Sequence, residues 1–437
     1  MIRFVLPLIL TLVTAVPLRA EVEIQEVKTP GGLTAWLVEE HSIPFTALEI
    51  WFKGGTSLDR EGKRGAINLM TATLEEGAGE MDALAFTRAK EMLAADFDYD
   101  VSDDTLTVSA RFLTENRDKA VALLRESLID PRFDQDAIDR VRGQVVSIIR
   151  SDEKDPNDMA GREFETQAFG DHPYGSDGNG TLDSVAGLTR DDILNAHADT
   201  MTRDRIYIGA VGDITPEDLA TLLDDLLGDL PETGAPMPDD IAPALTGGVT
   251  VVDYDTPQSV ALFGHTGIKR TSEDFFAAYL LNTILGGGGF ESRLMTEVRE
   301  KRGLTYGVYS FLVDKDHADL WMGQVQSAND RVAEAIDVIR TQWSDIAENG
   351  VTEEELTAAK KYLTGAYPLR FDGNGPIANI ITGMQIQDMP IDYAETRNDR
   401  VNAVTLEQVN DVAKRYLKPD DLRFVVVGKP EGLTSTN

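Results

Sequence analysis

Residue types that can bind a peptide backbone lie close together in one segment, GGGGFESRLMTEVREKRGLTY. Glycines leave backbone N–H groups uncovered, so an extended chain can approach them closely. Arg299 carries a planar fork of hydrogen-bond donors, and Tyr306 carries a hydroxyl group. Together these groups could hold a peptide in one groove. The four glycines are Gly286, Gly287, Gly288 and Gly289.

The sequence around this segment predicts how its residues are positioned. An apolar run, AAYLLNTIL, precedes the glycines, and the apolar spacing in SRLMTEVREK suits one buried helical face. Arg302 and Gly303 should end that helix, and the residues that follow read as a strand. We therefore expect Arg299 on the last helical turn and Tyr306 at the start of a strand. The glycine run lacks the Lys-Ser/Thr pair of a phosphate-binding loop.

The order G-G-G-x-x-S-R-L, then an arginine, then G-L-x-Y resembles the C-terminal half of the pitrilysin–insulinase peptidases, or inverzincins. In that family the matching arginine and tyrosine bind the substrate backbone beside a zinc ion. The zinc site lies in the other half of the protein, on an H-x-x-E-H helix. The resemblance covers most of the chain and implies this role for Arg299 and Tyr306.

The zinc-binding half of the resemblance is degenerate. An H-x-x-E-H helix works because residues i and i+4 share one face, so two histidines can bind one zinc while the glutamate acts as general base. The matching context here is GKRGAINLMTA, in which Asn68 replaces the first histidine, Thr71 the glutamate and Ala72 the second histidine. The third ligand would fall within residues 146–149, VSII, where no acid is present.

No other set of side chains in the sequence supplies a metal site. No histidine has another histidine three or four residues away, and the chain has no cysteine and no G-x-S-x-G motif. We therefore expect this chain to bind no metal or other cofactor, and to be inactive alone. The histidines are His41, His172, His197, His265 and His317.

The resemblance implies a non-catalytic, substrate-binding subunit of a heterodimeric zinc metallopeptidase. Its partner would be a homologous H-x-x-E-H subunit that holds the zinc, and its substrate a peptide or an unfolded protein. Arg299 and Tyr306 would then act in trans. Two alternatives stay open: a homodimer that binds peptides without cutting them, and a structural subunit of a larger assembly, like the core subunits of a respiratory complex.

The N-terminus and the net charge suggest where the chain works. Residues 1–20 have Arg3 near the start, then an apolar stretch, then a small-residue cleavage site, which is typical of a secretory signal peptide. We expect a periplasmic or secreted protein without a membrane span after cleavage, although the signal could remain as an anchor. The chain has 41 basic and 75 acidic side chains, a net charge of −34, which argues against nucleic acid as a partner.

An internal repeat divides the chain into two lobes. Residues 184–213 match residues 400–429, with Thr189 and Thr405 as equivalent helix N-caps. The repeat predicts an N-terminal lobe at 21–232, a Pro-rich linker at 233–246 and a C-terminal lobe at 247–432. Each lobe reads as an α+β unit, a mainly antiparallel sheet covered by helices on one face. By resemblance, the two homologous lobes form half of a clamshell.

Individual elements follow from hydrophobic periodicity and turn residues. Helices are expected to begin near Arg64, Asp82, Ser272 and Ser292, and two pairs of amphipathic helices are expected within 118–149 and 330–363. Strands are expected at Leu33–Glu39, Phe45–Phe52, Phe97–Ser102, Thr105–Phe112, Val249–Tyr254, Val260–His265, Thr305–Val313 and Ala318–Gln326.

Overall fold

The computed structural model describes residues 23–436, so the predicted signal peptide lies outside the described residues. The two lobes have the same strand order: β2-β8-β3-β7-β6 in the first, with β1 added at its edge, and β9-β13-β10-β12-β11 in the second. The first-lobe strands are β1 (Gln25–Lys28), β2 (Thr34–Glu39), β3 (Phe45–Lys53), β6 (Asp96–Val101), β7 (Thr105–Leu113) and β8 (Ile206–Gly212). The second-lobe strands are β9 (Gly248–Asp253), β10 (Gln258–Thr266), β11 (Val308–Lys315), β12 (Ala318–Ala328) and β13 (Arg423–Gly428).

Neighbouring strands are antiparallel except for the pairs β2/β8 and β13/β9, which are parallel. The prediction of two homologous, mainly antiparallel α+β lobes is therefore confirmed. A separate two-stranded sheet is formed by β4 (Gly77–Ala78) and β5 (Met81–Asp82).

The helices also repeat between the lobes. Thr189 and Thr405 each form a capping box at the start of α7 and α14, as the sequence predicts. The first-lobe helices are α1 (Ala66–Thr71), α2 (Ala83–Met92), α3 (Arg117–Ile129), α4 (Gln135–Asp152), α5 (Pro156–Phe169), α6 (Leu182–Ala186), α7 (Arg190–Thr200) and α8 (Pro216–Leu227). The second-lobe helices are α9 (Phe275–Asn282), α10 (Val332–Asn349), α11 (Glu353–Ala366), α12 (Asn374–Ile386), α13 (Tyr393–Ala403) and α14 (Leu406–Tyr416).

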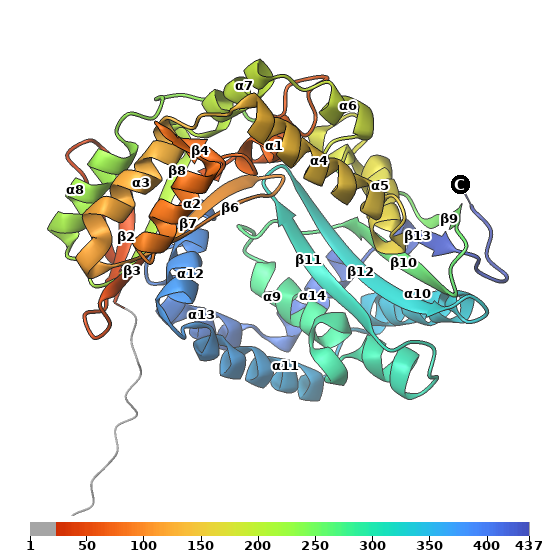
Figure 1. The fold of residues 1–437 in the computed structure, drawn as a ribbon. Helices are drawn as coiled ribbons and strands as arrows, with labels where there is room; N and C mark the ends of the chain where they lie inside the picture. The colour runs from red at the N-terminus through yellow and green to blue at the C-terminus, as the bar shows by residue number, and fades with distance from the viewer. Residues whose placement is uncertain (1–22, 437) are drawn as a thin grey trace, which may run out of the picture.

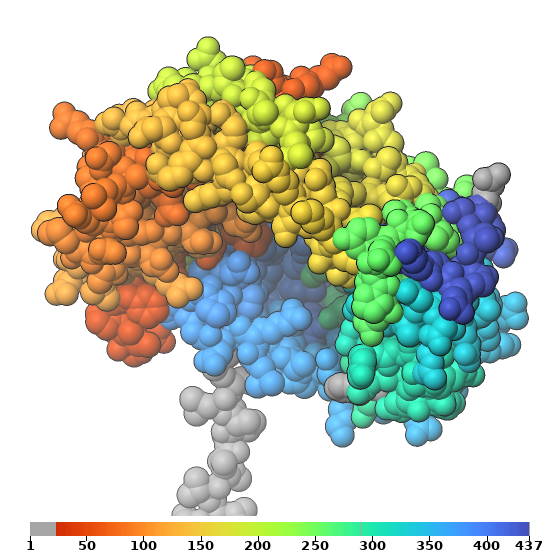
Figure 2. Space-filling model, turned by 45° about the vertical axis from the view of Figure 1, so that its right-hand side comes forward, coloured from red at the N-terminus to blue at the C-terminus, as the bar shows by residue number. Residues whose placement is uncertain are grey.

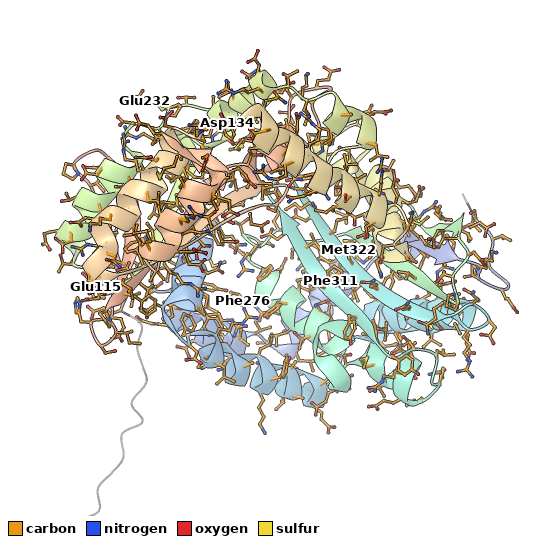
Figure 3. All side chains as sticks on the ribbon, in the orientation of Figure 1. Glu115, Asp134, Glu232, Phe276, Phe311 and Met322 are labelled. Carbon is orange, nitrogen blue, oxygen red and sulfur yellow. The ribbon has the colours of Figure 1, made fainter. Side chains whose placement is uncertain are left out.

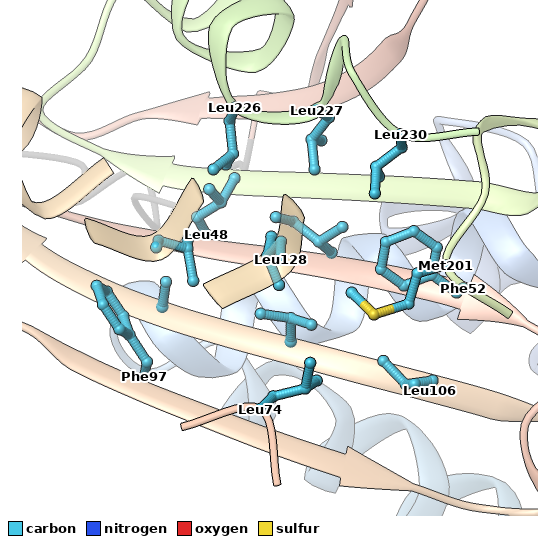
Figure 4. Packing of buried hydrophobic residues seen from close by; sticks show 14 of the residues in the cluster. Leu48, Phe52, Leu74, Phe97, Leu106, Leu128, Met201, Leu226, Leu227 and Leu230 are labelled. Atoms are coloured by element: carbon cyan, nitrogen blue, oxygen red, sulfur yellow. The ribbon is translucent and has the colours of Figure 1, made fainter. Parts of the chain in front are cut away.

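Each sheet buries one face under helices of its own lobe. In the first lobe, Leu48, Phe52 and Leu106 point from alternate strand positions into a core with Leu128 and Leu226, as Figure 4 shows. This alternation is the period-2 pattern of a strand with one buried face. The second lobe has an equivalent core around Trp321 and Trp343.

The opposite face of each sheet receives a helix from the other lobe. Helix α12 of the second lobe packs on β3 and β8 of the first, and α5 of the first lobe packs on β10 and β13 of the second. Figure 1 shows both crossings, and in Figure 2 blue residues of the second lobe lie directly against orange residues of the first. The sequence analysis predicted neither of these two helices nor their exchange, which joins the two lobes into one body.

The two lobes also meet at the tips of equivalent hairpins. The β11–β12 turn reaches the β6–β7 turn, where the ammonium of Lys315 binds Asp103. The backbone N–H of Asp316 donates to the Asp104 carboxylate at 3.2 Å, and the Tyr174 hydroxyl donates to the same carboxylate. These contacts fix the angle between the lobes.

Residues 228–247, between α8 and β9, form neither helix nor strand. They nevertheless bind the body of the protein, since the N–H of Ala235 donates to the backbone carbonyl of Asp199 and that of Ala244 to the carbonyl of Ala168. Among residues 23–436, no helix is long and apolar enough to cross a membrane.

Candidate functional site

Gly286 and Gly287 end a π-helical turn, η5 (Thr283–Gly287), and a second such turn, η7 (Met295–Glu300), follows the glycine run. Such turns are rare and occur frequently at functional sites. Gly286 contacts β11 so closely that a Cβ atom there would lie 2.5 Å from Ser310 Oγ. Gly289 has a φ of +65°, a conformation that favours glycine. The loop therefore needs glycine for two separate reasons, close packing at one end and backbone conformation at the other.

Arg299 lies on the last turn of η7, as predicted, although that helix is π rather than α. Its backbone carbonyl accepts a hydrogen bond from the N–H of Gly303 at 2.8 Å, which helps to end the helix. Arg299 is half-buried, and it takes part in a further interaction within the protein.

Tyr306 lies in a bend before β11, so the predicted start of this strand was wrong. The Thr305 hydroxyl binds the carbonyls of Gly307 and Gln326, which takes the place of ladder bonds there. Pairing with β12 therefore begins only at Val308. As a result the Tyr306 side chain is 87% exposed, the most exposed of the large hydrophobic residues in the described chain.

Further aromatic side chains follow Tyr306 along β11, which is the edge strand of its sheet. Tyr309 and Phe311 are 50% and 37% exposed, whereas Val308 and Ser310, which alternate with them along the strand, are buried. Figure 3 labels Phe311 beside Met322, its partner on β12. The strand thus presents a row of aromatic side chains on the face opposite the second-lobe core.

A cavity of about 220 Å³ lies beside the glycine loop. It is lined by Gly288, Thr283 and Tyr362, with carboxylates of Glu291 and Glu354. Arg299 and Tyr306 are not part of its lining. The single groove that was predicted for the glycines, the arginine and the tyrosine therefore stays a prediction.

Arg293 holds the segment against two helices, a role that the sequence did not reveal. Its guanidinium donates to both carboxylate oxygens of Glu355, at 2.5 and 2.9 Å, and to Asp345 at 2.9 Å. Burial raises the pKa of Glu355, but the bonds from Arg293 and Thr352 outweigh it and hold that pKa below its usual value. Arg293 thus stabilises the loop as a charged anchor.

The positions of the degenerate zinc motif carry no suitable ligands. The Asn68 amide donates to Asn179 at 3.0 Å, and the buried Thr71 hydroxyl donates to the carbonyl of Ile67. Ala72 has no donor atom, and Ile148 on α4, within the segment expected to hold the third ligand, is 49% exposed. Among residues 23–436, no three His, Cys, Asp or Glu side chains are grouped so that they could hold a metal ion. The residues present do not fit zinc.

Hydrogen bonds from neighbouring segments nevertheless hold α1 in place. The Asp59 carboxylate accepts hydrogen bonds from the N–H groups of Gly65 and Ile67, at 2.8 and 2.9 Å, and so caps the helix. Burial raises the pKa of Asp59 to about 6, against the effect of these bonds. Arg64 donates to the carbonyls of Asp177 and Ser176. The helix is thus held in place even though its side chains no longer suit the metal.

The two-lobed fold, together with a helix whose zinc positions hold no metal ligands, is that of a zinc-peptidase scaffold with a degenerate zinc motif. Residues 35–181 match the family model described as insulinase, peptidase family M16, and residues 187–363 match the model described as peptidase M16 inactive domain. The chain belongs to the peptidase M16 family, as a non-peptidase homologue.

Relatives from several organisms match along most of the chain. A Helicobacter pylori protein named non-peptidase homolog YmxG is 27% identical over 390 residues, which is 89% of this chain and 90% of the relative. A Streptomyces coelicolor protein named uncharacterized zinc protease SCO5738 is 26% identical over 401 residues, 89% of this chain and 86% of the relative. The mitochondrial-processing peptidase subunit beta of Blastocladiella emersonii is 23% identical over 422 residues, 94% of this chain and 90% of that subunit.

Solved structures agree with this assignment. The peptidase M16 inactive domain from Pseudomonas fluorescens superposes with a TM-score of 0.87 at 27% identity, over 95% of this chain and 100% of the other. A protease from Helicobacter pylori has a TM-score of 0.83 at 18% identity, over 93% of this chain and 99% of the other, and it shows the fold alone.

Proposed function

We propose that this chain is the non-catalytic, substrate-binding subunit of an exported heterodimeric zinc metallopeptidase. A homologous subunit with an intact H-x-x-E-H helix would hold the zinc ion. This chain would bind the peptide substrate and supply Arg299 and Tyr306 to the partner's site. Export to the periplasm or beyond is part of the proposal and rests on the signal-like N-terminus.

The exposure of Tyr306 is the observation that carries the proposal. A tyrosine side chain left 87% exposed contributes little to the stability of its own chain. It follows a glycine loop that is held in place by π-helical turns and by Arg293. The zinc positions on α1, by contrast, hold side chains that bind only within the protein. This combination supports substrate binding without chemistry in the chain itself.

The chemistry that Arg299 and Tyr306 would perform is electrostatic. When water attacks a peptide carbonyl, its oxygen gains negative charge, and preorganised donors stabilise that charge. The Tyr306 hydroxyl can donate one proton, and the guanidinium of Arg299 can bind backbone carbonyls through its planar fork. Loss of one such donor typically lowers the rate by about 10²–10³-fold.

The test is reconstitution with an H-x-x-E-H homologue encoded in the same genome. We expect a stable heterodimer with about one zinc ion, and we expect Arg299→Ala and Tyr306→Phe each to reduce kcat/KM by about 10²-fold without dissociating it. Arg299→Lys should also reduce kcat/KM, because an ammonium group lacks the planar fork of donors of a guanidinium. Steady-state kinetics and analytical ultracentrifugation measure both effects.

Arg302→Ala is the matched control, since Arg302 lies just after η7 and its guanidinium binds Glu297 on the surface. It should leave kcat/KM unchanged. Near wild-type activity of the double variant Arg299→Ala/Tyr306→Phe would contradict a role in trans. If the chain stayed monomeric with every such homologue, the heterodimer itself would be excluded.

A further inference from the structure

A second cavity, of about 470 Å³, lies where α12 of the second lobe crosses the sheet of the first. Its size is within the range of about 300–1,000 Å³ that is typical of small-molecule sites. Trp36 on β2 and Tyr207 on β8 line it from the sheet, and Met389 lines it from the segment after α12. Trp36 is 8% exposed and belongs to the cluster that packs α12 onto the sheet, so this wall is firmly fixed.

Opposite charges also line this cavity. Arg203 comes from the turn before β8, and Asp388 comes directly after the C-terminus of α12. One guanidinium nitrogen of Arg203, Nη2, donates to the carbonyl of Gly31. In the described part of the chain no hydrogen bond or ion pair engages its Nε and Nη1, the Asp388 carboxylate or the Tyr207 hydroxyl.

The end of α12 adds negative potential on the Asp388 side. A helix C-terminus carries about half a negative charge, which favours a cation near its last turn. Asp388 itself has a φ of +52° and is held there by its N–H, which donates to the carbonyl of Gln385 at 3.0 Å. Burial raises the pKa of Tyr207, so its hydroxyl stays a proton donor.

We propose that this cavity binds a short zwitterionic peptide with an apolar side chain. Its ammonium would pair with Asp388 at the α12 C-terminus, its carboxylate with Arg203, and its side chain would pack on Trp36, Tyr207 and Met389. Aromatic faces also attract an ammonium directly. Both termini of the ligand are engaged, so free dipeptides fit this chemistry and the interior of a long polypeptide does not.

The ligand would connect the two lobes. Trp36, Arg203 and Tyr207 belong to the first lobe, while Asp388 and Met389 belong to the second. The site therefore exists only because α12 crosses between the lobes. Binding there would stabilise the crossing, and this expectation is independent of any partner subunit.

Isothermal titration calorimetry of the full mature chain with L-phenylalanyl-L-leucine tests the proposal. We expect saturable binding to one site with a Kd below about 1 mM. N-acetylation of the dipeptide and the substitution Asp388→Asn should each weaken binding by about three- to tenfold, since each removes one ion pair at the exposed carboxylate of Asp388. Asparagine tolerates the positive φ, so Asp388→Asn should fold normally.

The losses of affinity from N-acetylation and from Asp388→Asn should not add, because both remove the same ion pair. C-terminal amidation of the dipeptide and Arg203→Gln should likewise each weaken binding, and their losses of affinity should not add, because both remove the ion pair of the ligand carboxylate. Asp372→Asn, an exposed aspartate before the other end of α12, is the matched control and should leave Kd unchanged. Absence of saturable binding up to about 10 mM would overturn the proposal. Equal affinity for free and acetylated dipeptide, or additive losses, would overturn the assigned ion pairs.

Discussion

Glu165 is a half-buried carboxyl group on α5, among charges of both lobes. Burial raises its pKa to about 7, partly opposed by the cation of Lys315 and reinforced by Asp103. The folded protein therefore holds this proton more tightly than the unfolded chain does. The resulting stabilisation is fully present below pH 4.5, the ordinary pKa, and is lost as the pH rises through about 7.

We expect Glu165→Gln to increase the free energy of unfolding at pH 8 by roughly 1–3 kcal/mol, because the amide cannot ionise. At pH 5 the difference from the parent protein should be much smaller. Urea denaturation at both pH values measures it. Glu163→Gln is the control, since Glu163 binds Gln167 on the same helix. A gain that is equal at both pH values would show that ionisation of Glu165 is not the cause.

Helix α12 can lie on the first-lobe sheet only because β8 has a glycine, Gly209, beneath it. A Cβ atom at Gly209 would lie 2.2 Å from Thr382 Oγ1 and 2.8 Å from the carbonyl of Ala378, both on α12. The helix backbone cannot shift easily, because Ile381 and Met384 are also buried against the sheet. Close packing of this kind does not tolerate added volume.

We therefore expect Gly209→Val to lower the free energy of unfolding by about 2–3 kcal/mol and to increase hydrogen exchange in α12. Gly143→Ala on α4 is the matched control, because a Cβ atom there meets nothing within 4 Å. That change should stabilise the protein by about 0.5–1 kcal/mol through helix propensity. Equal protection of α12 in Gly209→Val and the parent would contradict the proposed fit.

The whole molecule is held together by three sets of contacts besides the chain itself. Helix α12 packs on the first sheet, α5 packs on the second, and the hairpin tips meet through Asp103, Asp104 and Lys315. Each lobe alone would expose an apolar sheet face, which favours aggregation or loss of structure. The connection through residues 228–247 should therefore be dispensable once the protein has folded.

A protease site inserted after Glu232 tests this expectation, since Glu232 is exposed and Figure 3 shows it at the outer surface. After complete cleavage we expect a single species of unchanged mass on native gel filtration, with a Tm within a few degrees of the intact protein. The halves should separate only in denaturant. Separation under native conditions would mean that the helix exchange contributes little to stability.

Sequence patterns alone predicted the two-lobed repeat, most strand positions, the capping boxes at Thr189 and Thr405 and the loss of zinc ligands at Asn68, Thr71 and Ala72. These features depend on local signals: periodicity, caps and residue chemistry at fixed spacing. The resemblance to the inverzincins rested on the same local motifs, and the family assignment bears it out.

The surfaces that these elements share could be seen only in the folded protein. The exchange of α5 and α12, the late start of β11 after Tyr306, the anchor role of Arg293 and the cavity between Arg203 and Asp388 all join residues far apart in sequence. Local patterns carry no information on such pairs, because their free energy comes from packing and from ion pairs that form only once the lobes are together.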